Sequence, residues 1–213
     1  MTYTDLRLAV YDIDTGNKPL AVKTVGTGFA FAVASELHLS GTDGERRLTP
    51  GDGQFLDGSF EIAGAGWLFE LAPIGQSLLE GAGTVPVLSH RIELDFKGPY
   101  ILRADQVASN PGAQTPLHGH RGPGIRRLIA GRILATIGTT VECFEAGRAW
   151  YETGRDWVIG RNIHSGENIF VRVMVLPAEL KGGKSSFVPA NAEEADRPRS
   201  VNQRLLGEFD LRL

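Results

Sequence analysis

Apolar and polar residues alternate along many short segments of the chain, and glycines separate these segments. The alternation is clear in "ELHLSG" (36–41) and in "FVRVMVL" (170–176). Because successive side chains of a strand point to opposite faces, this pattern predicts strands with one buried face. Helical periodicity is almost absent before the C-terminal end of the chain. The pattern therefore predicts an all-β protein, built as a sandwich or a barrel.

One helical candidate lies near the C-terminus, in "NAEEADRPRSVNQRLLGEF" (191–209). Pro198 interrupts it, because proline lacks the N–H that a helix interior needs and clashes with the preceding turn. We therefore expect at most a short helical turn there. Residues 183–213 are predicted to form an extension that covers a sheet edge or a dimer partner.

A faint internal repeat runs through the chain. "LTPGDGQFLDG" (48–58) aligns with "FEAGRAWYETG" (144–154), and matching glycines are 96 residues apart (147 − 51). At the same separation "AVKTVG" (21–26) falls on "LHGHRG" (117–122) without a gap. A repeat of this length is typical of a chain that contains the same structural unit twice.

The repeat continues to the end of each half. "WLFELAP" ends at Pro73 and resembles "VRVMVLP", which ends at Pro177, if the second copy holds an insertion of eight residues. We therefore predict an N-terminal half over residues 1–95 and a C-terminal barrel over 96–182, followed by the extension 183–213.

Two histidines distinguish the second copy from the first. His118 and His120 are one residue apart, so on a strand both imidazoles face the same side, as in many metal sites of β-barrels. Their counterparts in the first copy are Val22 and Thr24. The sequence thus predicts a functional site in the second half.

The second half resembles the cupins, and the two-copy chain resembles a bicupin in particular. The first cupin motif has the form glycine, H-x-H, glutamate, glycine. Four positions match it, and Gly124 stands at the position of the glutamate: Gly112, His118, His120 and Gly131. The resemblance implies double-stranded β-helix (jelly-roll) barrels, two in this chain. It also implies a homodimer and a site for Fe, Mn, Ni or Zn.

The second cupin motif is matched in "AGRAWYETGRDWVIGRN" (146–162), where Trp157 stands at the position of the histidine. The matching residues are Gly147, Trp150, Tyr151, Glu152, Gly154 and Asn162. His164, in the turn that follows, is a less favoured ligand, and the sequence does not decide whether it or His90 reaches the site. The resemblance covers most of residues 110–180 and is weak in the first half.

Two functions compete on these residues. In the first, His118, His120 and Glu152 bind a divalent transition metal (Fe, Mn, Ni or Zn), which makes the protein an oxygenase or isomerase. In the second, Arg126 faces inward beside the histidines and pairs with Glu152. A guanidinium near the ligand position would repel a dication and suit an anion.

The second hypothesis gives a metal-free barrel that binds a small organic acid. Arg126 would hold its carboxylate, and Trp150, Tyr151 and Trp157 would form the walls of the pocket. A third interpretation treats the histidines as a retained polar pair in a structural or dimerisation module. The sequence does not decide between an enzyme and a ligand-binding protein.

Composition narrows the partners. The chain has 213 residues, 42% of them hydrophobic, as expected for an ordinary soluble protein. Its net charge of −3 and its pI near 6.0 argue against nucleic acid or an anionic membrane as partners. The N-terminal stretch "MTYTDLRLAVYDIDTG" has neither the basic nor the apolar region of a signal peptide, so we expect a cytoplasmic protein. Cys143 is the single cysteine, expected to be packed, and excludes an internal disulfide.

Overall fold

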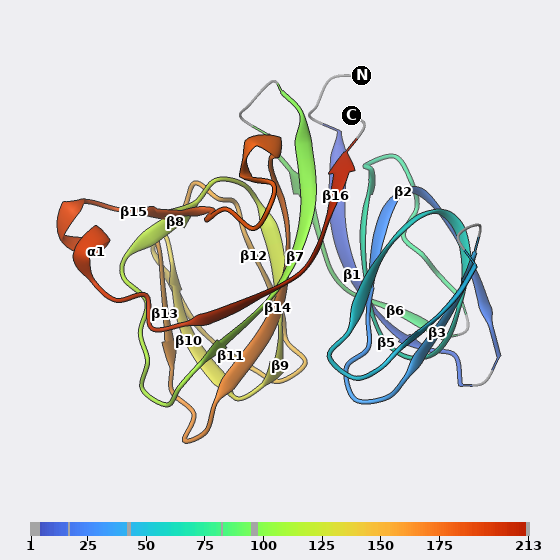
Figure 1. Cartoon of the computed structure of the whole chain (residues 1–213), viewed down its shortest axis with the longest axis horizontal. Helices are drawn as coiled ribbons and strands as arrows, with labels where there is room; N and C mark the ends of the chain where they lie inside the picture. Colours follow the sequence, from blue (N-terminus) through green and yellow to red (C-terminus); the bar gives the residue numbers. More distant parts are fainter. Residues whose placement is uncertain (1–4, 17, 42–43, 82, 95–97, 212–213) are drawn as a thin grey trace. The chain divides into compact units, whose positions relative to one another are not determined.

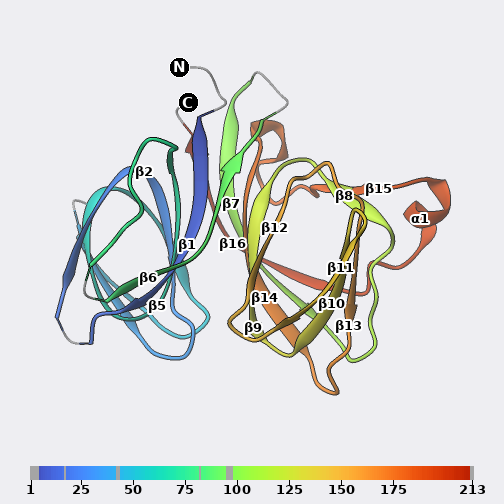
Figure 2. The same cartoon turned by 180° about the vertical axis from the view of Figure 1, so that it is seen from behind.

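The computed structural model describes residues 5–16, 18–41, 44–81, 83–94 and 98–211. It divides into two units, Met1–Glu93 and Leu94–Leu213. Both are built almost entirely of strands, which confirms the predicted all-β class (Figures 1 and 2). Across the described ranges, no helix is long and apolar enough to cross a membrane.

The N-terminal unit is organised around one long strand. Its strands are β1 (Leu6–Asp14), β2 (Leu20–Phe31), β3 (Leu37–Gly41), β4 (Gly44–Leu48), β5 (Gly53–Pro73) and β6 (Thr84–Ile92). They form a sheet in the order β4-β3-β5-β1-β6, and β2 also pairs with β5. Because β5 pairs with three other strands, it connects the whole unit.

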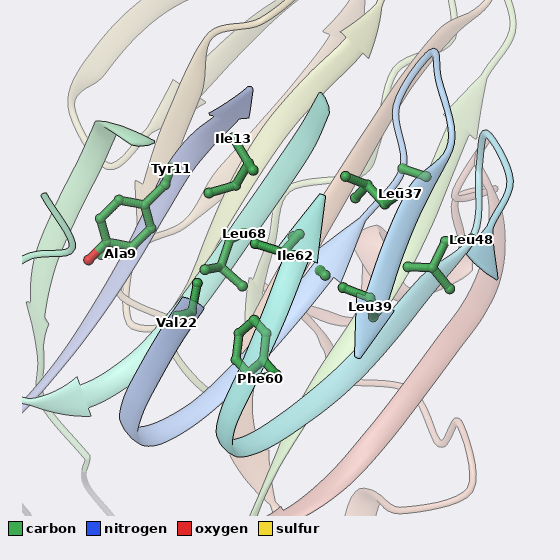
Figure 3. Packing of buried hydrophobic residues seen from close by; sticks show 12 residues of the cluster. Ala9, Tyr11, Ile13, Val22, Leu37, Leu39, Leu48, Phe60, Ile62 and Leu68 are labelled. Carbon is green, nitrogen blue, oxygen red and sulfur yellow. The ribbon is translucent and has the colours of Figure 1, made fainter. Parts of the chain in front are cut away.

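The interior of the N-terminal unit is filled mainly with apolar side chains. Figure 3 shows them converging from β1, β2, β3 and β5. Large members such as Tyr11, Phe60 and Ile62 are buried. Burial of this kind is the main stabilising contribution to a small β unit. The unit also buries an ion pair between Arg7 and Glu70, and the Glu70 carboxylate accepts a hydrogen bond from the Tyr11 hydroxyl at 2.8 Å.

The C-terminal unit consists of two five-stranded sheets. Sheet I has the order β12-β9-β14-β7-β16, and sheet II has the order β11-β10-β13-β8-β15. Sheet I contains β7 (Tyr100–Ser109), β9 (Gly124–Ala130), β12 (Ala149–Glu152), β14 (Asn168–Pro177) and β16 (Asn202–Leu211). Sheet II contains β8 (His118–His120), β10 (Arg132–Ile137), β11 (Thr140–Glu145), β13 (Val158–Asn162) and β15 (Phe187–Pro189).

The C-terminal extension adds one strand to each sheet. β15 pairs with β8, and β16 runs along β7, where it is drawn in red in Figure 1. Between them lies the short helix α1 (Ala192–Asp196), whose N-cap Asn191 accepts a hydrogen bond from Glu194 N. The helix ends two residues before Pro198, as the chemistry of proline requires. The segment after Pro198 is a strand instead of a helix.

The predicted repeat has a structural basis at two glycines. A Cβ on Gly26 would lie 1.8 Å from the carbonyl oxygen of Leu71, and a Cβ on Gly122 would lie 2.0 Å from that of Val175. Leu71 and Val175 each precede by two residues the proline that ends the strand. Both units therefore need glycine at the same point, because two backbones approach too closely there for any side chain.

Candidate functional site

A cavity of about 90 Å³ lies between the two sheets of the C-terminal unit. Sheet I contributes Val107, Arg126, Trp150, Glu152, Phe170 and Arg172 to its lining. Sheet II contributes His118, His120, Ile133, Ala135, Val158 and Gly160. A concave site with a few convergent polar groups and apolar walls is the usual form of a small-molecule site.

A row of four charged side chains crosses sheet I, and three of them line this cavity. Arg126 on β9 lies directly opposite Trp150 on β12 and Arg172 on β14, and Arg172 lies directly opposite Asp105 on β7. Residues directly opposite each other in a sheet share a face. Glu152 follows Trp150 by two residues and joins the same face. We call Glu152, Arg126, Arg172 and Asp105 the charged row.

Arg126 and Glu152 form a buried ion pair. Arg126 Nη2 lies 2.6 Å from Glu152 Oε2, and Arg126 Nη1 donates to Gly124 O at 2.7 Å. The other carboxylate oxygen, Oε1, accepts from Trp150 Nε1 at 2.9 Å. Burial lowers the pKa of Arg126 to about 10 against the opposing effect of Glu152, so the guanidinium is still charged at neutral pH.

Arg172 is the cation of the row with unused donors. Its Nε donates to Asp105 Oδ2 at 3.1 Å, and Gln203 Nε2 donates to Asp105 Oδ1 at 2.9 Å. Within the described residues, neither Nη group of Arg172 donates to a protein acceptor. Since Arg172 lines the cavity, these groups are available to a ligand.

The two histidines stand beside the charged row. His118 Nδ1 lies 2.8 Å from Pro116 O and must donate to that carbonyl, which fixes its tautomer. Its ring stacks on Phe187 with centroids 4.6 Å apart and meets His120 edge-on at 4.9 Å. His120 Nε2 lies 3.5 Å from Glu152 Oε2. Their shared face confirms the alternation argument for the H-x-H pattern.

Both imidazoles are neutral in this environment. Burial lowers the pKa of His118, and a backbone hydrogen bond to Pro116 opposes this effect only in part. Burial lowers the pKa of His120 well below its usual value, and the positive charges of Arg126 and Arg172 lower it further.

The three predicted metal ligands come together, but their donor set does not fit a metal ion. Glu152 lies directly opposite Gly124, the position of the cupin glutamate, so its carboxylate enters from the neighbouring strand. The oxygen that His120 approaches is the one that Arg126 contacts. A dication there would meet a guanidinium. In the part of the chain that the structure describes, no group of three His, Cys, Asp or Glu side chains is arranged to hold a metal.

The predicted wall residues divide between the cavity and the surface. Trp150 lines the cavity, whereas Tyr151 and Trp157 are not among the described residues that line it. Tyr151 follows Trp150 on β12 and takes the opposite face. Trp157 lies between β12 and β13 and is 45% exposed.

The remaining histidines and the cysteine lie elsewhere. His164 is exposed in the turn between β13 and β14, and His90 belongs to β6 of the N-terminal unit. Neither lines the cavity among the described residues. Cys143 is exposed on β11, an edge strand of sheet II, so its predicted packing is wrong.

Sequence reasoning missed Arg172, Asp105 and the residues at the mouth of the cavity. Arg199 lies over the Phe187 ring at 4.2 Å and donates to Ser185 Oγ at 2.9 Å. The one signal for Arg172 was its position as a lone charge in the apolar segment "FVRVMVL". A charge in such a strand is costly unless a partner neutralises it.

The N-terminal unit has uncharged residues at the register positions of the charged row, and its own buried ion pair, Arg7 with Glu70, lies at other positions. Ala30 lies opposite Leu68 there, at the register positions of Arg126 and Arg172. Leu56 pairs with Gly28, and Glu152 pairs with the corresponding glycine, Gly124. Tyr11 pairs with Leu68, and in the C-terminal unit Asp105 pairs with Arg172 in the same way. The counterparts of the charged row are thus Leu56, Ala30, Leu68 and Tyr11. The fold therefore does not require charges at these positions.

Comparison with solved structures identifies the fold. AerE from Microcystis aeruginosa is 17% identical, with a TM-score of 0.60 over 81% of this chain and 88% of that one. The formate complex of oxalate decarboxylase from Lactobacillus farciminis is 13% identical, with a TM-score of 0.65 over 92% and 82%. A cupin 2 conserved barrel domain protein from Leptotrichia buccalis is 7% identical, with a TM-score of 0.51 over 82% and 86%.

These similarities confirm the predicted cupin fold of jelly-roll type. At such low identities they establish architecture alone. No protein-family model matches the sequence, and no curated protein matches it either.

Proposed function

We propose that this chain is a bicupin whose C-terminal copy binds a small organic acid as its carboxylate, without a metal ion. The observation that carries this proposal is the charged row, at positions where the N-terminal copy has uncharged residues; one of them, Tyr11, donates its hydroxyl to Glu70. Buried charges contribute little net stability, and apolar replacements of similar size are often as stable. A row that the fold does not need is best explained by a ligand.

Arg172 is the anchor for the carboxylate. Arg126, predicted for this role, already contacts Glu152 and Gly124, whereas Arg172 keeps both Nη groups for the cavity. A guanidinium presents parallel N–H groups that match the two oxygens of a carboxylate. Arg126 contributes positive potential from the next strand. This potential also opposes the binding of a divalent ion by His118, His120 and Glu152.

The structural neighbours add support from chemistry. The oxalate decarboxylase neighbour is a formate complex, and both oxalate and formate are small carboxylates. A cavity of about 90 Å³ suits a carboxylate with a compact body of a few carbon atoms.

Calorimetric titration with acetate, in the presence of a chelator, tests the proposal. We compare the wild type with the Arg172→Leu/Asp105→Asn variant, which removes the positive charge of Arg172 and the negative charge of its partner Asp105 together. The control is Asp105→Asn alone, which keeps Arg172 and retains an oxygen for Gln203 to contact. We expect acetate to bind the wild type and the control, and to lose at least about tenfold in affinity in the double variant.

Two results would overturn the proposal. One is acetate binding of equal strength in the wild type and the double variant. The other is wild-type binding that appears only after a divalent metal is added, which would favour the metal-dependent oxygenase or isomerase.

A further inference from the structure

The wall of the cavity that faces the charged row is apolar and built from small residues. Ala135 on β10 lies directly opposite Gly160 on β13, and Val158 lies opposite Ile137 two residues farther along. Ala135, Gly160 and Val158 all line the cavity. The cavity therefore has one charged side, from sheet I, and one hydrocarbon side, from sheet II.

The N-terminal unit has large residues at the same register positions. Leu39 lies opposite Ile62, and Phe60 lies opposite Gly41, in the pairing of β3 with β5. These three side chains are buried in the filled interior that Figure 3 shows. Leucine, isoleucine and phenylalanine in the N-terminal unit thus correspond to alanine, glycine and valine in the C-terminal unit. The fourth position changes in the opposite direction, from Gly41 to Ile137, but Ile137 is not among the described residues that line the cavity.

This exchange of large for small residues opens space beside Arg172. Unfilled apolar space lowers stability, because the lining atoms lose packing partners. The small residues therefore do not improve the fold of the C-terminal unit. Instead, they leave apolar surface uncovered near Arg172, the carboxylate anchor. A site that binds an apolar group needs such a surface.

We infer that the ligand is a monocarboxylic acid with a compact, branched aliphatic body. This inference rests on the proposed carboxylate site. The carboxylate lies at Arg172, and the aliphatic body fills the space in front of Ala135, Gly160 and Val158. Each methylene buried there strengthens binding by about fourfold.

A second carboxylate would not suit this wall. It would lose its hydration against Ala135 and Gly160 without gaining a partner. The nearby amide of Asn162 is already engaged, since its Nδ2 donates to Ser109 O at 2.9 Å and to Gly166 O at 3.0 Å. Its Oδ1 accepts from His164 N at 2.8 Å. The apolar wall therefore discriminates against dicarboxylates.

The test is calorimetric titration of formate, isobutyrate and succinate into the wild type and Ala135→Leu. This substitution restores the leucine that the N-terminal unit has at this position. We expect the wild type to bind isobutyrate more than about tenfold more tightly than formate. In Ala135→Leu, the affinity ratio of isobutyrate to formate should fall by at least about tenfold, and circular dichroism checks that the variant is folded.

Two further variants support the interpretation. Thr136→Leu adds the same bulk to the outward face of β10 and should leave both affinities unchanged. Gly160→Ala is a smaller change, for use if Ala135→Leu does not fold. Its Cβ would lie 3.3 Å from Ile133 Cδ1, so it narrows the cavity by displacing the Ile133 side chain, which also lines it. It should lower isobutyrate affinity selectively.

The remaining outcomes overturn the inference in distinguishable ways. Equal affinity for formate and isobutyrate would show that no apolar subsite exists, although the carboxylate site would stand. Tighter binding of succinate, lost in Arg199→Gln, would place a second charged group at the mouth instead. Failure of all three acids to bind would reject the proposed function itself.

Discussion

Arg126 Nη2 lies 2.6 Å from Glu152 Oε2, the same carboxylate oxygen that His120 Nε2 approaches at 3.5 Å. The strand register places them there, because Trp150 lies opposite Arg126 and Glu152 shares the face of Trp150. A guanidinium thus takes the position beside the H-x-H pair where a cation would otherwise be bound. This arrangement is the basis of our proposal that the site binds an anion.

Removing the guanidinium should create a metal site. Arg126→Ala introduces the residue that the N-terminal copy has at this register position, Ala30, and frees Glu152. We expect this variant to bind one Co²⁺ or Zn²⁺ through His118, His120 and Glu152, because imidazole and carboxylate suit these ions. Cobalt absorption spectra measure the binding. The Arg126→Ala/Glu152→Gln variant should not bind, and equal uptake by both variants would contradict the assignment.

The ion pair should show strong coupling in unfolding experiments. Arg126→Ala or Glu152→Leu alone leaves a buried charge without its partner and should cost about 3–5 kcal/mol of unfolding free energy. The double variant restores the pair found in the N-terminal copy and should cost much less than the sum. Urea unfolding of all four proteins measures the coupling. Additive effects would show that the pair is not a unit.

Acid should destabilise the C-terminal unit through its histidines. Folding lowers the pKa of His118 and His120, so below about pH 6.5 the unfolded chain binds protons that the folded chain excludes. The unfolding free energy should then fall with decreasing pH, by up to about 1.4 kcal/mol per pH unit for each histidine. This loss continues until the pH reaches the pKa of the folded state.

The matched variant is His118→Val/His120→Thr, which introduces the residues of the first copy. It should flatten the pH dependence of urea unfolding between about pH 6.5 and 5. An unchanged slope would mean that folding does not lower the pKa of the two histidines.

The fold and part of the site could be predicted from local sequence patterns. Alternation is a property of neighbouring residues, so it correctly places His118 and His120 on one face. The same rule puts Trp150 and Glu152 together and excludes Tyr151 from their face, a consequence that the motif comparison overlooked. Trp157 lies in a loop, where alternation gives no direction for its side chain.

The rest of the site depends on strand register, which is not local. Arg172 and Asp105 are 67 positions apart in the chain and meet only because β14 pairs with β7. The residue pattern within either strand does not predict this pairing. The apolar wall likewise becomes visible only when Ala135 and Gly160 are known to be opposite each other.

The metal content of the wild-type protein tests the central claim most directly. Protein purified without a histidine tag is incubated with Fe²⁺, Mn²⁺, Ni²⁺ or Zn²⁺, desalted and measured by inductively coupled plasma mass spectrometry. Because Arg126 occupies the position beside Glu152 and His120, we predict a content far below one equivalent of any of these metals. About one equivalent per chain that is lost in His118→Ala would contradict the account and establish a metal site.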